Sequence, residues 1–94
     1  MDLRSVKEIK AKINSCIHNH IDDYWEGFIG GLMDIYLPIH KEYPALTVEE
    51  MWQIIKKEGK RRFWDNGVYI QTEEYMKGYD DALNWVNKEE VEFT

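Results

Sequence analysis

Cysteine is nearly absent from this sequence, and its scarcity limits the chemistry open to the chain. The single cysteine, Cys16, cannot form a disulfide within the chain, which fits a reducing compartment. Serine is also scarce, since Ser5 and Ser15 are the only two. Neither lies in the glycine-flanked turn that exposes a nucleophilic serine. Because a lone thiol in a helical pattern is most often a packing residue, we expect a protein that is not an enzyme and uses no cofactor.

Long apolar runs and an excess of basic residues are missing as well. No segment reaches the roughly 18 consecutive apolar residues of a membrane-spanning helix, and the first residues lack the apolar core of a secretory signal. We therefore expect a cytoplasmic protein that makes no membrane contact. The net charge is −6, which argues against a general nucleic-acid-binding protein.

What is present is enough apolar material for one small folded domain. The chain has 94 residues, of which 44% are hydrophobic and 14% aromatic. This length and composition predict a single folded domain over residues 1–94 and exclude a disordered chain. The spacing of apolar residues described below predicts that this domain is helical. Four tryptophans and six tyrosines are more than a thin core can bury, so some of these rings should reach the surface, as they do at interfaces.

Hydrophobic spacing predicts two helices in the first 37 residues. Apolar residues recur three and four positions apart, first in Val6, Ile9, Ile13, Ile17 and Ile21 and then in Tyr24, Phe28 and Leu32. Asp2 is the predicted cap of the first helix. We expect a break near Asn19–Asp22, where Asn and Asp can cap a new helix. One continuous helix over 3–37 is the alternative. Pro38 is expected to end the second helix.

The second half predicts two more helices. Thr47 and Glu50 have the spacing of a capping box at the start of the third helix. The apolar face of this helix is predicted to contain Met51, Trp52 and Ile55, with Phe63 as a further member. Gly59 is either the end of the helix or an interior glycine. Asp65-Asn66-Gly67 is a turn. We favour the end of this helix there, and a short hairpin over 62–70 is the alternative. Thr72 is predicted to cap the last helix, with Glu73 and Glu74 in its first turn, Lys88 in its last, and a buried face of Tyr75, Tyr79, Leu83 and Val86. The fold class is an all-α bundle of three to four helices with short loops.

A ten-residue pattern occurs twice. Tyr-Trp-Glu-Gly-Phe-Ile-Gly-Gly-Leu-Met at 24–33 returns in weaker form as Tyr-Met-Lys-Gly-Tyr-Asp-Asp-Ala-Leu-Asn at 75–84, an offset of 51 residues. In each copy small residues lie four apart, Gly27 and Gly31 and then Gly78 and Ala82. On a helix this spacing forms a smooth stripe that another backbone can approach closely.

The glycines of the first copy need an energetic explanation. Glycine inside a helix costs about 1 kcal/mol relative to alanine, so some structural gain must offset Gly27, Gly30 and Gly31. Close packing of two helices within the monomer is the explanation that we favour. A self-complementary seam between two copies of the chain, and a kink or the approach of a small ligand at Gly30 and Gly31, are the alternatives.

Charge is arranged in blocks along the chain. Residues 21–50 and 63–94 each carry −6, whereas residues 1–20 carry +2 and residues 51–62 carry +4. Lines of carboxylates can imitate a phosphate backbone and occupy a nucleic-acid-binding groove; the candidates are Asp22, Asp23, Glu26, Asp34, Glu73, Glu74, Asp80 and Asp81. In composition the chain is similar to small acidic helical proteins of phages and other mobile elements, many of which bind and block a host protein. That similarity involves no motif.

These patterns favour a non-enzymatic binding protein, in its sharpest form an inhibitor of a nucleic-acid-handling or defence protein. We expect a protein partner, and a homodimer is the alternative. The predicted contacts combine the aromatic and small-residue surfaces of two helices with acidic flanks: Tyr24, Trp25, Gly27, Phe28, Gly31, Tyr75, Gly78, Tyr79, Asp80 and Asp81.

A basic stretch supports an alternative function. Basic groups beside an aromatic ring can hold a phosphate and stack on a base, and this arrangement occurs in Lys56, Lys60, Arg61, Arg62 and Trp64. The alternative is a nucleotide-binding or small-anion-binding module that uses residues 56–64, the only part of the chain where nucleic-acid contact is expected. A solvated helix face is the simpler interpretation of the same residues.

Potential metal ligands support a second alternative. They gather in residues 16–26 as Cys16, His18, His20, Asp22, Asp23 and Glu26, and His40 can fold back toward them. No recognised ligand spacing is present, neither His-Glu-x-x-His nor Cys-x-x-Cys. We therefore favour polar residues around a helix break over a metal-dependent enzyme, and we assign no metal ligand.

Overall fold

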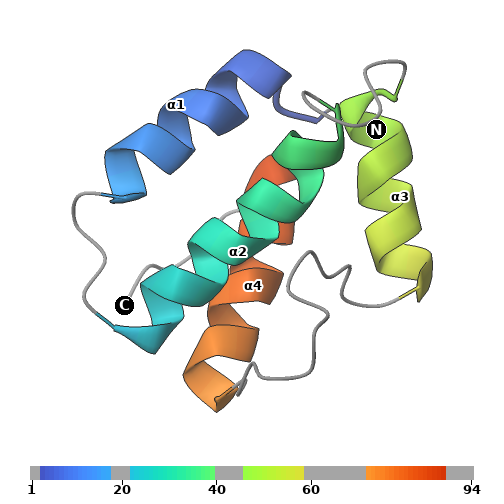
Figure 1. Cartoon of the computed structure of the whole chain (residues 1–94). Coiled ribbons are helices and arrows are strands. Elements are labelled where there is room, and N and C mark those ends of the chain that lie inside the picture. The colour runs from blue at the N-terminus through green and yellow to red at the C-terminus, as the bar shows by residue number, and fades with distance from the viewer. Residues whose placement is uncertain (1–2, 18–21, 40–45, 59–71, 89–94) are drawn as a thin grey trace.

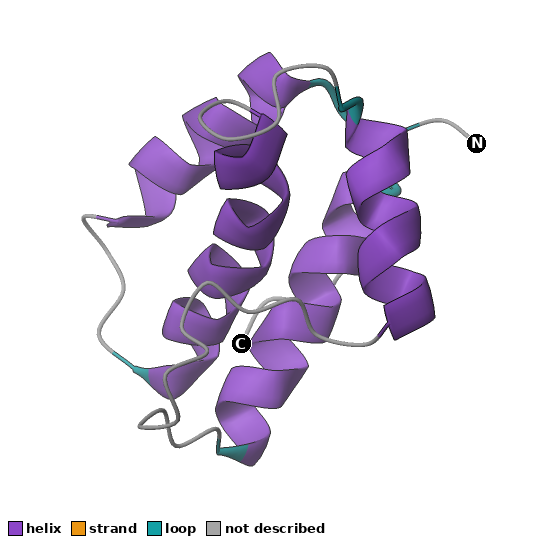
Figure 2. Ribbon diagram, turned by 45° about the vertical axis from the view of Figure 1, so that its right-hand side comes forward, coloured by secondary structure: helices purple, strands orange, loops and turns teal. Residues whose placement is uncertain are grey.

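The computed structural model of the chain describes residues 3–17, 22–39, 46–58 and 72–88. These residues form four helices, α1 (Val6–Ile17), α2 (Asp23–Leu37), α3 (Val48–Glu58) and α4 (Glu73–Val86), which Figure 1 labels. Figure 2 shows helices and short connecting segments but no strand in the described part. The predicted all-α bundle of three to four helices is confirmed. Each helix found in these ranges is too short or too polar to span a bilayer.

Three of the helices begin where the sequence predicts. Asp22 has an extended backbone (φ −139°, ψ 172°), and its carboxylate accepts a hydrogen bond from the Trp25 N–H at 3.0 Å. The continuous helix over 3–37 is therefore wrong, and the predicted break is confirmed. Thr47 and Glu50 form the reciprocal capping box, with both bonds at 3.1 Å. Thr72 caps α4 by accepting from the Tyr75 N–H. α2 ends at Leu37, just before Pro38, as predicted.

The start of α1 differs from the prediction. The helix begins at Val6, and its capping box is formed by Ser5 and Glu8 instead of by Asp2, which lies outside the described residues. The Glu8 N–H donates to Ser5 Oγ at 3.2 Å, and the Ser5 N–H donates to Glu8 Oε1 at 3.2 Å. The Ser-x-x-Glu spacing that signals this cap is visible in the sequence and has the same form as Thr47 to Glu50.

The end of α4 also differs, because Lys88 lies beyond the helix instead of in its last turn. α4 ends at Val86, and Asn87 caps it by donating its N–H to the carbonyl of Leu83 at 3.1 Å. Lys88 has a left-handed backbone (φ 56°), and its N–H donates to the carbonyl of Trp85 at 3.0 Å. A residue in this conformation is a common helix stop.

The seam between α2 and α4 explains the glycines. A methyl group built on Gly27 would overlap the backbone carbonyl oxygen of Tyr75, and one built on Gly78 would overlap that of Tyr24. At Gly30 it would overlap the Tyr75 hydroxyl. The helices therefore approach to backbone contact, where Cα–H groups can face carbonyl oxygens. Close packing within the monomer, the explanation favoured from the sequence, accounts for Gly27, Gly30 and Gly78.

The contacts across this seam occur in matched pairs. Gly27 meets Tyr75, and Gly78 meets Tyr24, so the two copies of the repeat exchange equivalent partners. Gly31 meets its own counterpart, since a methyl group there would lie 2.9 Å from the Ala82 Cβ. An approximate two-fold axis between α2 and α4 produces this pattern. Because early residues meet early residues and later residues meet later ones, the two helices run in the same direction, as Figure 1 shows.

The remaining helices complete the core on either side of this pair. Ile9, Ile13 and Cys16 are the buried residues of α1. α3 buries Met51, Trp52 and Ile55, which confirms its predicted apolar face. The Trp52 indole N–H donates to the carbonyl of Leu83 at 3.1 Å. The predicted buried face of α4 is also confirmed, because its four members are at most 5% exposed: Tyr75, Tyr79, Leu83 and Val86.

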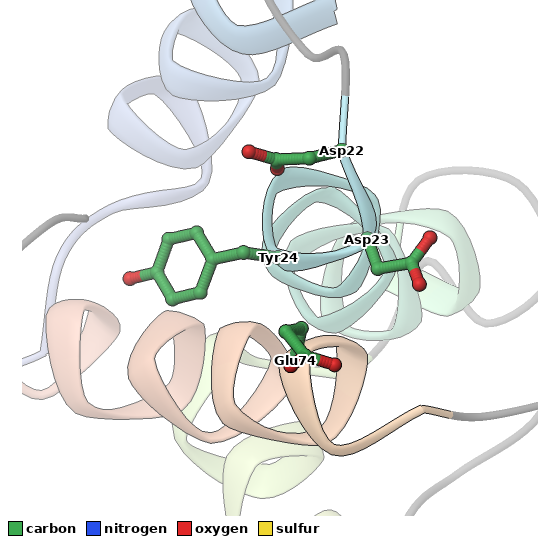
Figure 3. Close-up of a pocket in the computed structure, with 4 residues that line it drawn as sticks. All are labelled: Asp22, Asp23, Tyr24 and Glu74. Carbon is green, nitrogen blue, oxygen red and sulfur yellow. The ribbon is translucent and has the colours of Figure 1, made fainter.

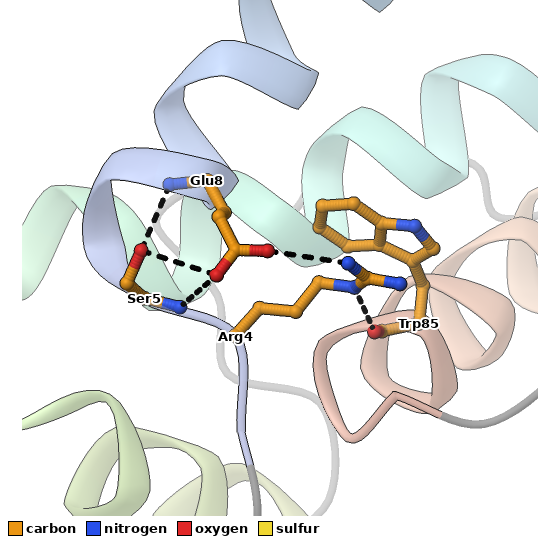
Figure 4. A network of polar contacts seen from close by, with 4 residues as sticks. All are labelled: Arg4, Ser5, Glu8 and Trp85. Carbon is orange, nitrogen blue, oxygen red and sulfur yellow. Dashed lines mark hydrogen bonds and ion pairs between the residues drawn. The ribbon is translucent and has the colours of Figure 1, made fainter.

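Arg4 ties the start of α1 to the end of α4, as Figure 4 shows. Its backbone N–H donates to the carbonyl of Val86 at 2.8 Å, and its Nε donates to the carbonyl of Trp85 at 2.8 Å. The guanidinium carbon lies 4.2 Å from the centroid of the Trp85 ring, and Nη1 pairs with Glu8 at 3.2 Å. One arginine therefore connects the carbonyls at the end of α4 with the capping box of α1.

Several predictions fall on residues that the structure does not describe. They are Gly59, Phe63, the turn at 65–67 with its alternative hairpin over 62–70, and residues 91–94. These stay predictions.

Candidate acidic interface

The starts of α2 and α4 lie at the same end of the molecule because the two helices run in the same direction. A hydrogen bond joins them directly: the Thr72 hydroxyl donates to the Asp23 carboxylate at 3.0 Å. Both helices begin with acidic residues, Asp23 and Glu26 in α2 and Glu73 and Glu74 in α4. Carboxylates are favoured there by the unpaired N–H groups and the positive end of the helix dipole. Packing thus brings the two acidic starts together.

An open hollow of about 520 Å³ lies at this junction and is lined by Asp22, Asp23, Tyr24 and Glu74. Figure 3 shows the two aspartates at the start of α2 and Glu74 on the neighbouring turn of α4. Three of the four lining residues are carboxylates, and each is exposed to solvent. Three exposed carboxylates therefore border the hollow.

Tyr24 is the neutral member of this group and is held from α4. Its hydroxyl donates to Asp81 at 2.7 Å, and Lys77 Nζ lies 5.3 Å from its ring centroid and 3.6 Å from Asp81. Burial raises the pKa of Tyr24, and the hydrogen bond to Asp81 and the charges of Asp81 and Asp22 raise it further. The hydroxyl is thus a proton donor to Asp81 and not a nucleophile or base near neutral pH.

Seven of the eight acidic residues singled out from the sequence retain some contact with solvent. Asp22, Asp23, Glu26, Glu73, Glu74 and Asp80 are exposed, and Asp81 is partly buried. Asp34 is different and must be removed from the predicted acidic line, because it is only 2% exposed. It lies on the glycine stripe that faces α4, where it accepts a hydrogen bond from the Tyr79 hydroxyl at 2.7 Å.

Most of the predicted partner-contact residues lie inside the protein. Tyr24, Gly27, Phe28, Gly31, Tyr75, Gly78 and Tyr79 are buried. Their surfaces pack against each other across the α2–α4 seam or against the core. The members of the predicted set with accessible surface are Trp25, Asp80 and Asp81. Within the predicted set, the acidic flanks and Trp25 are therefore the residues with surface accessible to a partner, and the glycine stripes are not.

The potential metal ligands of the second alternative are only partly described. His18, His20 and His40 lie outside the described ranges. Among the residues that are described, no group of three or more His, Cys, Asp or Glu could hold a metal ion. Cys16 is buried beside a hollow of about 210 Å³ that is also lined by Lys12, Ser15 and Trp25. Desolvation raises the pKa of the Cys16 thiol, which Lys12 partly counteracts, so the thiol is less reactive than an exposed one.

The basic stretch is represented by Lys56 alone among the five residues named for anion binding. Lys56 is exposed on α3, and its Nζ lies 5.4 Å from the centroid of the Trp52 ring. Lys60, Arg61, Arg62 and Trp64 lie outside the described residues. The nucleotide-binding alternative stays a prediction.

The junction of α2 and α4 contains residues that local sequence patterns did not single out. Lys77 belongs to no local pattern in the sequence, and no local pattern indicates the Thr72–Asp23 bond or the Tyr24–Asp81 bond. The partners in these two bonds are 49 and 57 residues apart. The one available signal was the repeat itself, which pairs residues 51 positions apart.

No protein-family model, curated protein or solved structure matches this chain. What the protein can bind is therefore inferred from the geometry and charge of its described residues.

Proposed function

We propose that this chain is a non-enzymatic binding protein that uses its acidic end to bind a basic surface on another protein. The acidic end consists of the exposed carboxylates at the starts of α2 and α4: Asp22, Asp23, Glu26, Glu73 and Glu74. In its most specific form, the partner is a nucleic-acid-handling protein, and the chain inhibits it by occupying the basic groove that would otherwise hold phosphates.

The observation that supports this proposal best is the convergence of two acidic helix starts that are far apart in the sequence. Asp22, Asp23 and Glu74 line one hollow, and the Thr72–Asp23 hydrogen bond fixes the helices beside each other. Like charges brought together repel one another, so the arrangement has a cost that a positively charged partner would relieve.

Two of these carboxylates also accept hydrogen bonds within the protein. Asp22 caps α2, and Asp23 accepts from Thr72. Within the described part of the chain, Glu26, Glu73 and Glu74 form no side-chain hydrogen bond or ion pair, although the helix dipole favours acidic residues at their positions. These three glutamates are therefore the groups most available to a partner.

Electrostatic binding of this type has a recognisable signature. Exposed carboxylates steer a basic partner over distances comparable to the Debye length, about 10 Å at 0.1 M salt. Rising salt should therefore slow association and weaken the complex. A nucleic acid that occupies the same basic groove should compete directly with the protein.

A capture experiment tests the proposal. The chain is immobilised and exposed to cell lysate, and the bound protein is identified and then challenged with salt or with a short nucleic-acid duplex. We expect a nucleic-acid-binding protein that is released by either treatment, because both compete for the same charges. A partner that resists both treatments, or no specific partner at all, would contradict the proposal.

A further inference from the structure

We draw no further inference here: the strongest candidate, the hollow between α1 and α2 lined by Lys12, Ser15, Cys16 and Trp25, contains a lone buried thiol, and nothing in the structure shows what occupies it.

Discussion

At the scale of single residues, the stability of the fold depends on positions where adding one methyl group or removing one hydroxyl should lower the free energy of unfolding. Glycine is required at the seam because the backbones of α2 and α4 touch there. Tyrosine hydroxyls are required beside it because they donate to carboxylates on the opposite helix, Tyr24 to Asp81 and Tyr79 to Asp34.

Gly27→Ala and Gly78→Ala should both destabilise the fold, and by similar amounts. On an exposed helix, the same change would stabilise by about 1 kcal/mol. Here the new methyl group overlaps a backbone carbonyl that cannot rotate away, so we expect a net loss of about 2 kcal/mol or more. Gly31→Ala should cost less, because its methyl group would lie 2.9 Å from Ala82 Cβ and 3.0 Å from Tyr79 O. Urea denaturation measures all three. An increase in stability for Gly27→Ala would contradict the described seam.

Tyr79→Phe should destabilise the protein more than Tyr24→Phe. Removing the Tyr79 hydroxyl takes a hydrogen-bond donor from Asp34, a carboxylate that is only 2% exposed. Losing a hydrogen bond to a buried charged group costs about 1–3 kcal/mol. Asp81 is partly exposed, so water can replace the lost hydrogen bond when Tyr24 becomes Phe. Equal losses of unfolding free energy for the two variants would show that burial of Asp34 does not matter.

The sequence allowed some of these residues to be predicted and not others, for a physical reason. Thr47, Asp22 and Thr72 act through partners three residues away, so their patterns are local and were predicted. Asp34 was placed on the surface because it is charged. Its position three residues after Gly31 puts it on the seam, but the tyrosine that compensates its burial lies 45 residues away.

At the scale of helices, capping determines where the elements begin. The side chain of one capping residue accepts a hydrogen bond from a backbone N–H at the start of each helix. These residues are Ser5, Asp22, Thr47 and Thr72. α1 additionally depends on Arg4, which bonds the end of α4 and pairs with Glu8. The attachment of α1 therefore includes an ionisable group, Glu8, whose protonation should matter.

The stability of the α1 start should decrease in acid. The Ser5 N–H hydrogen bond lowers the pKa of Glu8 below its ordinary value of 4.5, and the Arg4 bond lowers it further against an opposing effect of desolvation. A lowered pKa in the folded state means that Glu8 stabilises the fold above about pH 4.5 and that this contribution is lost as the pH falls through the folded-state value. NMR titration of the Glu8 carboxyl in the folded protein should give a lower pKa than the same carboxyl has in an unfolded peptide of the surrounding sequence. Equal values would contradict the capping box.

Local sequence patterns could not predict whether α2 and α4 run parallel or antiparallel to each other. Two smooth stripes predict close approach, but a stripe fits a parallel or an antiparallel neighbour equally well. The matched contacts of Gly27 with Tyr75 and of Gly78 with Tyr24 establish the parallel arrangement. An antiparallel pair would have separated the two acidic starts by the length of a helix.

At the scale of the whole molecule, the parallel crossing of α2 and α4 links the fold to the proposed function. The internal two-fold relation places both acidic starts at one end, while the start of α3 lies away from them, as Figure 1 shows. Five exposed carboxylates of the described residues are thus gathered at this end: Asp22, Asp23, Glu26, Glu73 and Glu74. Under the proposed function, this local concentration of carboxylates steers a basic partner to one end of the molecule.

α3 provides a matched control for the acidic end. Glu74 and Glu49 are both exposed, and each is the second helical residue after a capping threonine, Thr72 in α4 and Thr47 in α3. Replacing either with glutamine removes one negative charge near a helix dipole, so the effects on stability should be alike. A difference between the two variants in binding would therefore reflect where the charge lies.

The dissociation constant of the captured partner for Glu74→Gln and for Glu49→Gln, measured at low and at high salt, is the most direct test. We predict that Glu74→Gln weakens binding about threefold to tenfold at low salt, that the loss shrinks at high salt, and that Glu49→Gln binds like the unaltered chain. Equal effects of the two changes, or none from Glu74→Gln, would contradict the acidic end as the binding surface.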